Sequence, residues 1–427
     1  MNALLTPFEL LFLSFLRYNK LVMIKKILAV SAAAIVAGAL AFSGCKTEEE
    51  EGKLNRYSRT FYAFGTEATF ALYSDFDSKE AQDEAIALGK QIEQVLTSLE
   101  NKLSVSVEGS DIYNFNAAEP GARVEISEDT YNVLELALEL YEETDGAYNA
   151  GVYYSVDLYG FAARADDESL PYDREDASKQ LPEQKYVSAF CELSQSFGDI
   201  SLESADGKYY AVKPEKTVTV GGDSTEYSLK IDLGGIGKGY TVDVIDKMME
   251  DAGYSDSYIS FGSSSWNING SATSEDGKWD LGFRDPRGSI VDYYFSVRLK
   301  DSAVSTSGDY EQYYEIDGKR YCHIINPATG SPIQTGIITA TCLGGTAAEA
   351  DARTTALCAM GLEKAVEYIN NVGKQNNLKI TLAYQSEDGN LYFVTNIPEG
   401  EYQLVSDNYT IASTINEDGD VVLAKNI

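Results

Sequence analysis

The sequence predicts an α+β fold, built as a single compact mixed α/β unit over residues 57–427. Helical and strand-like segments follow one another without the regular alternation that is typical of a parallel α/β sheet. No linker and no internal repeat divides this stretch. The chain of 427 residues is 44% hydrophobic and 11% aromatic, with 30 Tyr, so it has enough apolar surface for packed cores.

The first predicted elements are a strand region over Tyr57–Tyr73, interrupted by Gly65, and a long helix that begins after Asp77 or Ser78. The helix is predicted because apolar residues recur at steps of three and four, which places them on one buried face. These residues are Ala85, Leu88, Ile92, Val95, Leu99 and Leu103.

The remaining elements follow from the same signals. A second helix fits Asp129–Thr144, a third follows Gly239 and ends before Gly253, and residues 162–230 look polar and irregular. Weak strands are expected at Lys208–Val212 and Thr217–Val220, and stronger ones at Ser257–Phe261, Trp279–Phe283, Tyr293–Leu299 and His323–Ile325. Two further helices are expected at Ala347–Met360 and about Leu362–Asn371, before a strand-rich tail.

The first 44 residues predict a signal region. From Met23, the more normal start, a basic beginning and an apolar stretch lead to Phe42-Ser43-Gly44-Cys45, which resembles a bacterial lipoprotein cleavage box. We therefore expect an exported protein that is lipidated at Cys45 and held at the outer side of the cytoplasmic membrane, with residues 45–56 as an acidic tether. The alternative is an uncleaved membrane anchor over residues 27–43, near the lower length limit for a span.

Charge and composition exclude several classes of protein. Lys and Arg number 34 against 67 Asp and Glu, a net charge of −33, which argues against nucleic-acid binding. Without the signal region, 30 basic residues face 66 acidic ones, a net of −36. One His and five dispersed Cys exclude a zinc site of several histidines, and a Ser/His/Asp hydrolase would have only His323 as its base. The Cys spacings specify no disulfide framework.

A glycine-rich turn over Ile231–Asp243 is the most informative segment. Four Gly in six positions, 234 to 239, leave backbone N–H groups uncovered just before a helix, and such turns favour anions, especially phosphate. Lys238 adds a positive charge there. The turn is not a P-loop, because Asp232 and Gly239 replace the first Gly and the Ser/Thr of that motif. A tight strand-to-helix connection without function is the alternative.

Two other segments carry candidate chemistry. Asp351 and Thr355 lie four residues apart at a helix start, hence on one face, and a carboxylate with a hydroxyl suits Mg²⁺. The alternative is a capping acid beside an ordinary Thr. His323, before the turn Pro327–Gly330, is a candidate general base or phosphate donor, although a lone His on a strand is often structural.

These segments together resemble the FAD:protein FMN transferases, the ApbE-like family once called thiamine-biosynthesis lipoproteins. The resemblance covers about residues 60–361 and the lipoprotein start. Its specific parts, in order, are Gly65-Thr66, Leu103–Asn116, Thr144–Tyr148, Asp232–Asp243, Thr306–Tyr310, His323–Gly330 and Ala350–Leu357. It implies an enzyme that uses FAD and Mg²⁺, moves FMN onto a Thr or Ser hydroxyl of a target protein, and releases AMP.

The resemblance also implies roles for individual residues. Asp351 and Thr355 match magnesium-ligand side chains, and Gly235 falls where a backbone carbonyl completes the metal site. The positions matched to FAD contacts are Phe64, Ser106, Ala147, Tyr148, Asn149, Asp232, Lys238 and Ile325. Lys238 would stabilise the developing charge, and His323 or Asp309 would accept the proton of the target hydroxyl. The family suggests a membrane electron-transfer subunit as the acceptor.

Three departures from the family pattern leave rival functions open. Ser106 stands where many relatives have an aromatic side chain over the cofactor, and Asn149 and Asn326 stand where Asp is usual. Loss of the aromatic contact would weaken FAD binding by about 1 kcal/mol and would admit water. One rival is therefore a Mg²⁺-dependent FAD pyrophosphatase that yields FMN and AMP. The other is a non-catalytic flavin-binding lipoprotein.

Overall fold

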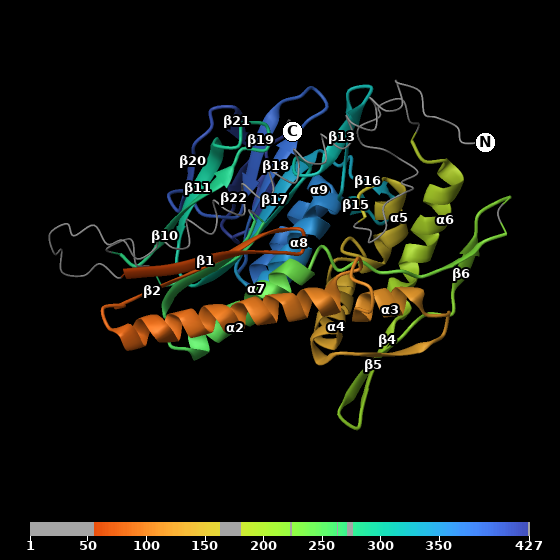
Figure 1. Cartoon of the computed structure of the whole chain (residues 1–427). Helices are drawn as coiled ribbons and strands as arrows, with labels where there is room; N and C mark the ends of the chain where they lie inside the picture. The colour runs from red at the N-terminus through yellow and green to blue at the C-terminus, as the bar shows by residue number, and fades with distance from the viewer. Residues whose placement is uncertain (1–54, 163–180, 223, 263, 271–275, 426–427) are drawn as a thin grey trace, which may run out of the picture. The chain divides into compact units, whose positions relative to one another are not determined.

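The computed structural model describes residues 55–162, 181–222, 224–262, 264–270 and 276–425. The signal region, Cys45 and nearly all of the tether lie outside the described residues. Leu54–Ile427 forms one compact unit of helices around a large sheet, so the predicted α+β class is confirmed (Figure 1). No helix in the described ranges is both long and apolar enough to cross a membrane.

A nine-stranded sheet forms the centre of this unit. Its strand order is β1-β2-β8-β9-β12-β17-β18-β19-β21, and every pair is antiparallel except β19 with β21. The strands are β1 Asn55–Ala63, β2 Thr66–Ser74, β8 Asp256–Phe261, β9 Ser265–Asn269, β12 Ser302–Gly308, β17 Ile337–Leu343, β18 Lys379–Gln385, β19 Leu391–Thr395 and β21 Tyr409–Ile411.

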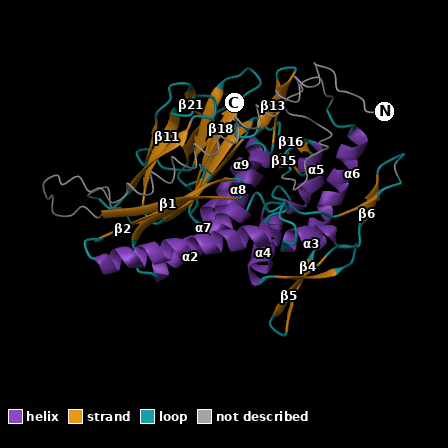
Figure 2. Ribbon diagram, viewed as in Figure 1, coloured by secondary structure: helices purple, strands orange, loops and turns teal. Residues whose placement is uncertain are grey.

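Helices cover one face of this sheet (Figure 2). The helices that pack on it are α2 Lys79–Leu103, α7 Gly237–Asp251, α8 Ala347–Met360 and α9 Leu362–Tyr368, the last continued by a π-helical turn over Ile369–Gly373. The other helices, α3 Asp111–Ala117, α4 Glu128–Glu143, α5 Tyr153–Leu158 and α6 Gln184–Ser194, belong to apolar clusters of described residues that contain no residue of the nine strands. Residues of α2 and α7 pack with β1, β2 and β8, and residues of α8 and α9 pack with β17 and β18.

A three-stranded sheet packs on the opposite face. It consists of β10 Trp279–Arg284, β11 Tyr293–Leu299 and β20 Tyr402–Leu404. The middle strand β17 is buried along its whole length because Ile338 and Leu343 join the cluster with this small sheet, whereas Ile337 and Cys342 join the cluster with α8 and α9. Burial on both faces explains why β17 carries no charged residue, and its two polar residues, Thr339 and Thr341, are buried with their hydroxyls hydrogen-bonded to β12.

The other strands form a small sheet and four two-stranded ribbons. The sheet is β3 Arg123–Ile126, β5 Lys208–Val212 and β4 Ser201–Ala205; the ribbons are β6 Thr217–Thr219 with β7 Glu226–Ser228, β13 Tyr313–Ile316 with β14 Lys319–Cys322, β15 Ile325–Asn326 with β16 Ser331–Pro332, and β22 Ser413–Ile415 with β23 Val421–Leu423. The four described cysteines, Cys191, Cys322, Cys342 and Cys358, are all free thiols.

Two sequence-based expectations need correction. The predicted strand over His323–Ile325 is wrong at its start, because β14 ends at Cys322 and the chain crosses at His323 to the next ribbon. The segment 162–230 is not irregular throughout, because it contains α6 and β4. Burial of Val187, Phe190 and Leu193 on one face supports α6, a pattern too short to stand out in a polar stretch.

Candidate functional site

The glycine-rich turn leads directly into the start of α7 at Gly237, which is the arrangement expected of a phosphate-binding turn. The helix begins at Gly237, and its N-cap residue Ile236 has no side chain that could accept hydrogen bonds from the first backbone N–H groups. Asp232 Oδ1 accepts the Gly234 N–H at 2.8 Å and closes the turn. The Lys238 ammonium bends back over it and donates to the Gly234 carbonyl at 2.7 Å.

Asp351 lies on α8 with both carboxylate oxygens directed at this turn and at the sheet. It is 2% exposed. Its Oδ2 accepts the Gly239 N–H at 3.1 Å and lies 3.8 Å from Lys238 Nζ, while its Oδ1 accepts from Ser305 Oγ at 3.3 Å. The predicted partnership between the glycine-rich turn and the helix of Asp351 is therefore a direct contact in the structure.

Thr355 lies one turn further along α8, beside the backbone of Gly235. A Cβ added to Gly235 would stand 3.4 Å from Thr355 Oγ1 and 3.5 Å from Cε2 of Tyr148. Thr355 Oγ1 also lies 3.2 Å from the Asp351 carbonyl and 3.4 Å from Ser307 Oγ. The three predicted metal ligands thus lie on two elements that touch.

Helices α7 and α8 approach closely because Gly239 has no side chain. A Cβ there would lie 2.3 Å from the Ala347 carbonyl oxygen, far inside contact distance. The Asp243 carboxylate, one turn on, accepts the backbone N–H groups of Ala347 and Ala348 at 2.7 and 2.9 Å. This acid satisfies donors at the start of α8 and complements the positive end of its dipole. Burial raises the pKa of Asp243 to about 6, despite these hydrogen bonds.

The donor set fits a hard cation. A carboxylate, a hydroxyl and a backbone carbonyl are oxygen ligands of the kind that Mg²⁺ prefers, and Mg²⁺ usually takes one or two carboxylates plus substrate phosphates. Among the described residues, no group of three or more His, Cys, Asp or Glu is placed to hold a metal. Binding at Asp351 would therefore depend on neutral oxygens and on a phosphate that arrives with the substrate.

The Tyr148 hydroxyl is an unpaired donor at this place. Its side chain is 2% exposed, and its hydroxyl has no hydrogen-bond partner in the described part of the chain. Burial, together with the charges of Asp351 and Asp232, raises the pKa of Tyr148 well above its usual value, so the group keeps its proton. A buried hydroxyl without a partner costs about 1–3 kcal/mol, which a ligand oxygen at this position would recover.

The other residues predicted to contact FAD differ in how the protein holds them. Phe64, at φ 50° between β1 and β2, donates its N–H to Glu100 on α2 at 2.8 Å and meets Phe261 edge to face. Ser106 follows α2 and shares a 3.0 Å hydrogen bond with Ser104. Asn149 uses both ends of its amide in protein contacts, because it accepts the Gly151 N–H and donates to the Ser194 carbonyl. Ala147 is half-buried beside the core of α4.

The two candidate proton acceptors differ in what surrounds them. Arg287 donates to both Asp309 oxygens at 2.8 Å, and Arg320 adds a contact at 3.3 Å, so that carboxylate is held in ion pairs. His323 is half-buried, and its Nδ1 lies 3.4 Å from the Gln312 carbonyl. Ile325, two residues later, is buried in a separate apolar cluster, so its side chain packs in the protein interior.

Three residues that the sequence reasoning did not select also belong here. Ser305 and Ser307 lie on β12 and contact the α8 side chains Asp351, Thr354 and Thr355. Their spacing of two on a strand was the available signal, because it places both on one face. The Glu311 carboxyl has a raised pKa because surrounding protein disfavours its charge, an effect that Lys238 and Arg284 oppose and Asp351 reinforces.

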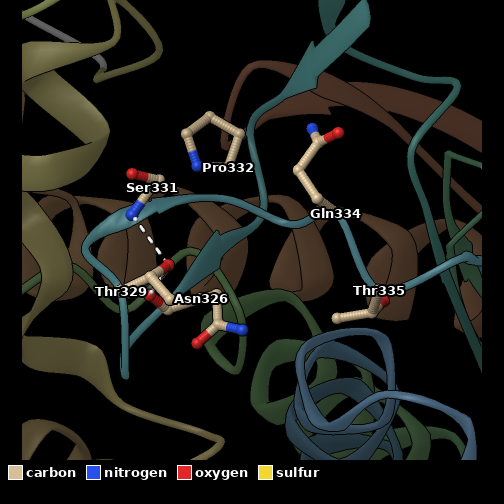
Figure 3. Close-up of a pocket in the computed structure, with 6 residues that line it drawn as sticks. All are labelled: Asn326, Thr329, Ser331, Pro332, Gln334 and Thr335. Carbon is tan, nitrogen blue, oxygen red and sulfur yellow. Dashed lines mark hydrogen bonds between the residues drawn. The ribbon is translucent and has the colours of Figure 1, made fainter.

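A hollow of about 320 Å³ lies at the β15–β16 ribbon, beside the end of α8 (Figure 3). Its lining residues are Asn326, Thr329, Ser331, Pro332, Gln334 and Thr335. Several of their polar groups already bond to the protein, since Asn326, Gln334 and Thr335 each donate to a backbone carbonyl. The charged and metal-binding side chains therefore favour the glycine-rich turn, and not this hollow, as the functional site.

The model of the ApbE family matches residues 64–381, the stretch that contains all of these contacts. The chain belongs to the ApbE family. The FAD:protein FMN transferase of Escherichia coli strain K12 is 28% identical over 344 residues, which cover 80% of this chain and 89% of that protein. The FAD:protein FMN transferase of Treponema pallidum strain Nichols is 28% identical over 327 residues, covering 73% and 81%.

Solved structures of the ApbE family share this fold. The ApbE protein of Thermotoga maritima has a TM-score of 0.63 at 25% identity and covers 79% of this chain and 96% of that one. The flavin transferase ApbE of Vibrio cholerae has a TM-score of 0.62 at 23% identity, with 80% and 96% covered. The predicted family is thereby confirmed.

Proposed function

We propose that this protein transfers the FMN part of FAD to a Thr or Ser hydroxyl of an acceptor protein, with Mg²⁺, and releases AMP. The observation that carries the proposal is the contact between Lys238 at the phosphate-type turn and Asp351 on α8, in a member of the ApbE family. The names of the Escherichia coli and Treponema pallidum relatives support the same activity.

The turn supplies the positive potential that the rest of the chain lacks. A net charge of −33 repels a pyrophosphate, so local groups must offset this repulsion. Lys238 supplies such a local positive charge at the start of α7, where the helix dipole also favours anions, and the Tyr148 hydroxyl adds one more donor. Phosphoryl transfer depends mostly on positioning and charge neutralisation, which is what these groups provide.

Asp351, Thr355 and the Gly235 carbonyl would hold Mg²⁺, which when bound neutralises charge on the pyrophosphate. Around it, Ser305 and the Gly239 N–H fix the orientation of the Asp351 carboxylate through the contacts at 3.3 and 3.1 Å. Such outer contacts keep a carboxylate ready for a ligand.

The reaction is a substitution at the FMN-side phosphorus. The acceptor hydroxyl oxygen forms a bond to this phosphorus, the bond to the AMP phosphate breaks, and AMP leaves with its electron pair. We assign the hydroxyl proton to His323 and not to Asp309, because Arg287 and Arg320 hold the Asp309 carboxylate in ion pairs.

We further propose that the protein acts outside the cytoplasmic membrane, anchored through lipid on Cys45, on a membrane electron-transfer subunit. The sequence Phe42-Ser43-Gly44-Cys45 and the acidic tether support this placement. Mass spectrometry of the mature N-terminus tests it. A diacylated Cys45 is expected, and a mature chain that retains residues 23–44 would contradict it.

The experiment that tests the activity is incubation of the protein with FAD, Mg²⁺ and the membrane fraction of its own cell. Covalent flavin fluorescence on a denatured protein band, with FMN mass on a Thr or Ser peptide, is the expected result. Asp351→Ala should abolish it. Glu363→Ala is the matched control, since Glu363 is an exposed acid at the start of the adjacent helix α9.

Two other outcomes identify the rival functions. Free FMN and AMP without covalent flavin would indicate a FAD pyrophosphatase, the reaction that Ser106 in place of an aromatic residue favours. Tight FAD binding without either product would indicate a flavin-binding protein. Full transfer by Asp351→Ala would contradict the assigned metal site.

A further inference from the structure

Arg284, the last residue of β10, differs from the other arginines in the described part of the chain. Seven others there, namely Arg56, Arg59, Arg123, Arg287, Arg298, Arg320 and Arg353, each have a hydrogen-bond or ion-pair partner. For Arg284, no such partner lies within the described ranges, and its Nε is buried without a hydrogen bond. Buried polar groups in native proteins are nearly always paired, so this guanidinium is short of an acceptor.

The guanidinium lies on an aromatic ring at the edge of the proposed site. Its central carbon is 5.2 Å from the centroid of Tyr310, which holds the planar group against the ring face. The Tyr310 ring folds back over Gly308, where a Cβ would lie 2.3 Å from the ring. Gly308 follows Ser307, whose hydroxyl bonds to Thr354 at 2.9 Å and contacts Thr355 at 3.4 Å. Arg284 thus lies over a ring that packs against Gly308, the last residue of β12, next to the strand residue Ser307 that contacts Thr355.

The charges around Glu311 connect Arg284 to the phosphate turn. Desolvation of the carboxyl group and the charge of Asp351 raise the pKa of Glu311, and Lys238 and Arg284 oppose this rise, although the residue itself keeps exposed surface. Glu311 nevertheless forms no ion pair among the described residues, so it does not neutralise either cation by direct contact. Lys238 and Arg284 are therefore two cations near one carboxyl group, in a chain with 67 acidic residues.

We propose that Arg284 binds a phosphate oxygen of the FAD substrate and acts with Lys238 as a positioning residue. This inference rests on the proposed function. A guanidinium stacked on a ring presents its N–H groups in a fixed plane, which suits two oxygens of a phosphate. A phosphate oxygen would then be the acceptor that the Nε–H of Arg284 lacks among the described residues.

The test compares binding of FAD and of riboflavin, which lacks phosphate, by fluorescence titration with Mg²⁺ present. Arg284→Gln should weaken FAD binding about 10- to 100-fold, the usual effect of a lost charge-assisted hydrogen bond, and leave riboflavin binding unchanged. Arg284→Lys keeps the charge and should recover only part of the loss. Arg298→Gln removes the same charge from an exposed residue that is paired with Asp276 and Asp280, and should leave both affinities unchanged.

The outcomes separate this inference from the proposed function. Equal FAD affinity of Arg284→Gln and wild type would overturn the role of Arg284, and so would equal losses in Arg284→Gln and Arg298→Gln, which indicate a long-range charge effect. Parallel losses for FAD and riboflavin would indicate a packing defect and overturn it as well. If the wild type binds FAD with this dependence on Arg284 but transfers no FMN, only the proposed function fails.

Discussion

Replacing Arg353 by Met should destabilise the protein without changing its chemistry. Arg353 is 4% exposed and donates to both oxygens of Glu143 on α4 at 3.0 and 3.1 Å, with Glu349 at 3.4 Å. Burial alone would raise the pKa of Glu143, but hydrogen bonds from Arg353 and Tyr368 reverse this effect and lower it. The substitution therefore leaves two acidic groups without their cation.

The magnitude follows from how exposed these acids are. Breaking a buried ion pair by removing one partner costs about 3–5 kcal/mol. The side chains of Glu143 and Glu349 keep 25% and 28% exposure, so water recovers part of the cost and we expect the lower value, about 3 kcal/mol. Removing the stranded acid as well, in Arg353→Met with Glu143→Gln, should restore part of the loss.

Urea unfolding measures the effect as a shift of midpoint at constant slope. The transfer rate per folded molecule should stay unchanged, because Arg353 faces α4 whereas Asp351 and Thr355, on the same helix, face the phosphate turn. A loss below about 1 kcal/mol would refute the reasoning. A double variant no more stable than Arg353→Met would refute it too, because the stranded acid would then not be the cause.

Two further changes act on α7. Gly239→Ala should cost about 3 kcal/mol in urea unfolding, since its Cβ would lie 2.3 Å from the Ala347 carbonyl oxygen, and an unchanged midpoint would contradict the close packing. Burial raises the pKa of Asp246 to about 6 despite its hydrogen bonds from Asn267 and Asn269, so the folded state holds this proton more tightly than the unfolded state. The contribution of Asp246 to the free energy of unfolding therefore falls as the pH rises from about 4 to 6. The stability of Asp246→Asn relative to wild type should rise by up to about 3 kcal/mol between pH 4 and 7. A stability difference between the two proteins that stays constant over this range would contradict the assignment.

The elements that the sequence predicted best are those whose ends carry local signals. Helix α8 has the predicted bounds Ala347–Met360, because Thr346 caps its start in a capping box and Gly361, at φ 81°, follows its end. The long helix α2 begins at the predicted cap Ser78 and buries nearly all of the predicted face. Such signals depend on residues within a few positions of each other, so they are readable in a single sequence.

Contacts between distant segments could not be predicted in this way. The predicted site residues Lys238 and Asp351 are 113 positions apart, and the family resemblance, not their spacing, placed them together. Arg284 gave no sequence signal, because an arginine short of partners becomes evident only when the partners of the other arginines are known. His323 was expected on a strand because its neighbours are apolar, yet Cys322 and Ile325 belong to two separate ribbons and pack in different apolar clusters.

Three of the four described cysteines are buried thiols of low reactivity. Burial raises the pKa of both Cys322 and Cys342 to about 12, and that of Cys358 well above its usual value. Because the thiolate is the reactive form, these groups stay protonated and inert at neutral pH. The described part of the chain therefore owes no stability to disulfide bonds among its own cysteines, and its folding needs no thiol oxidase or disulfide isomerase.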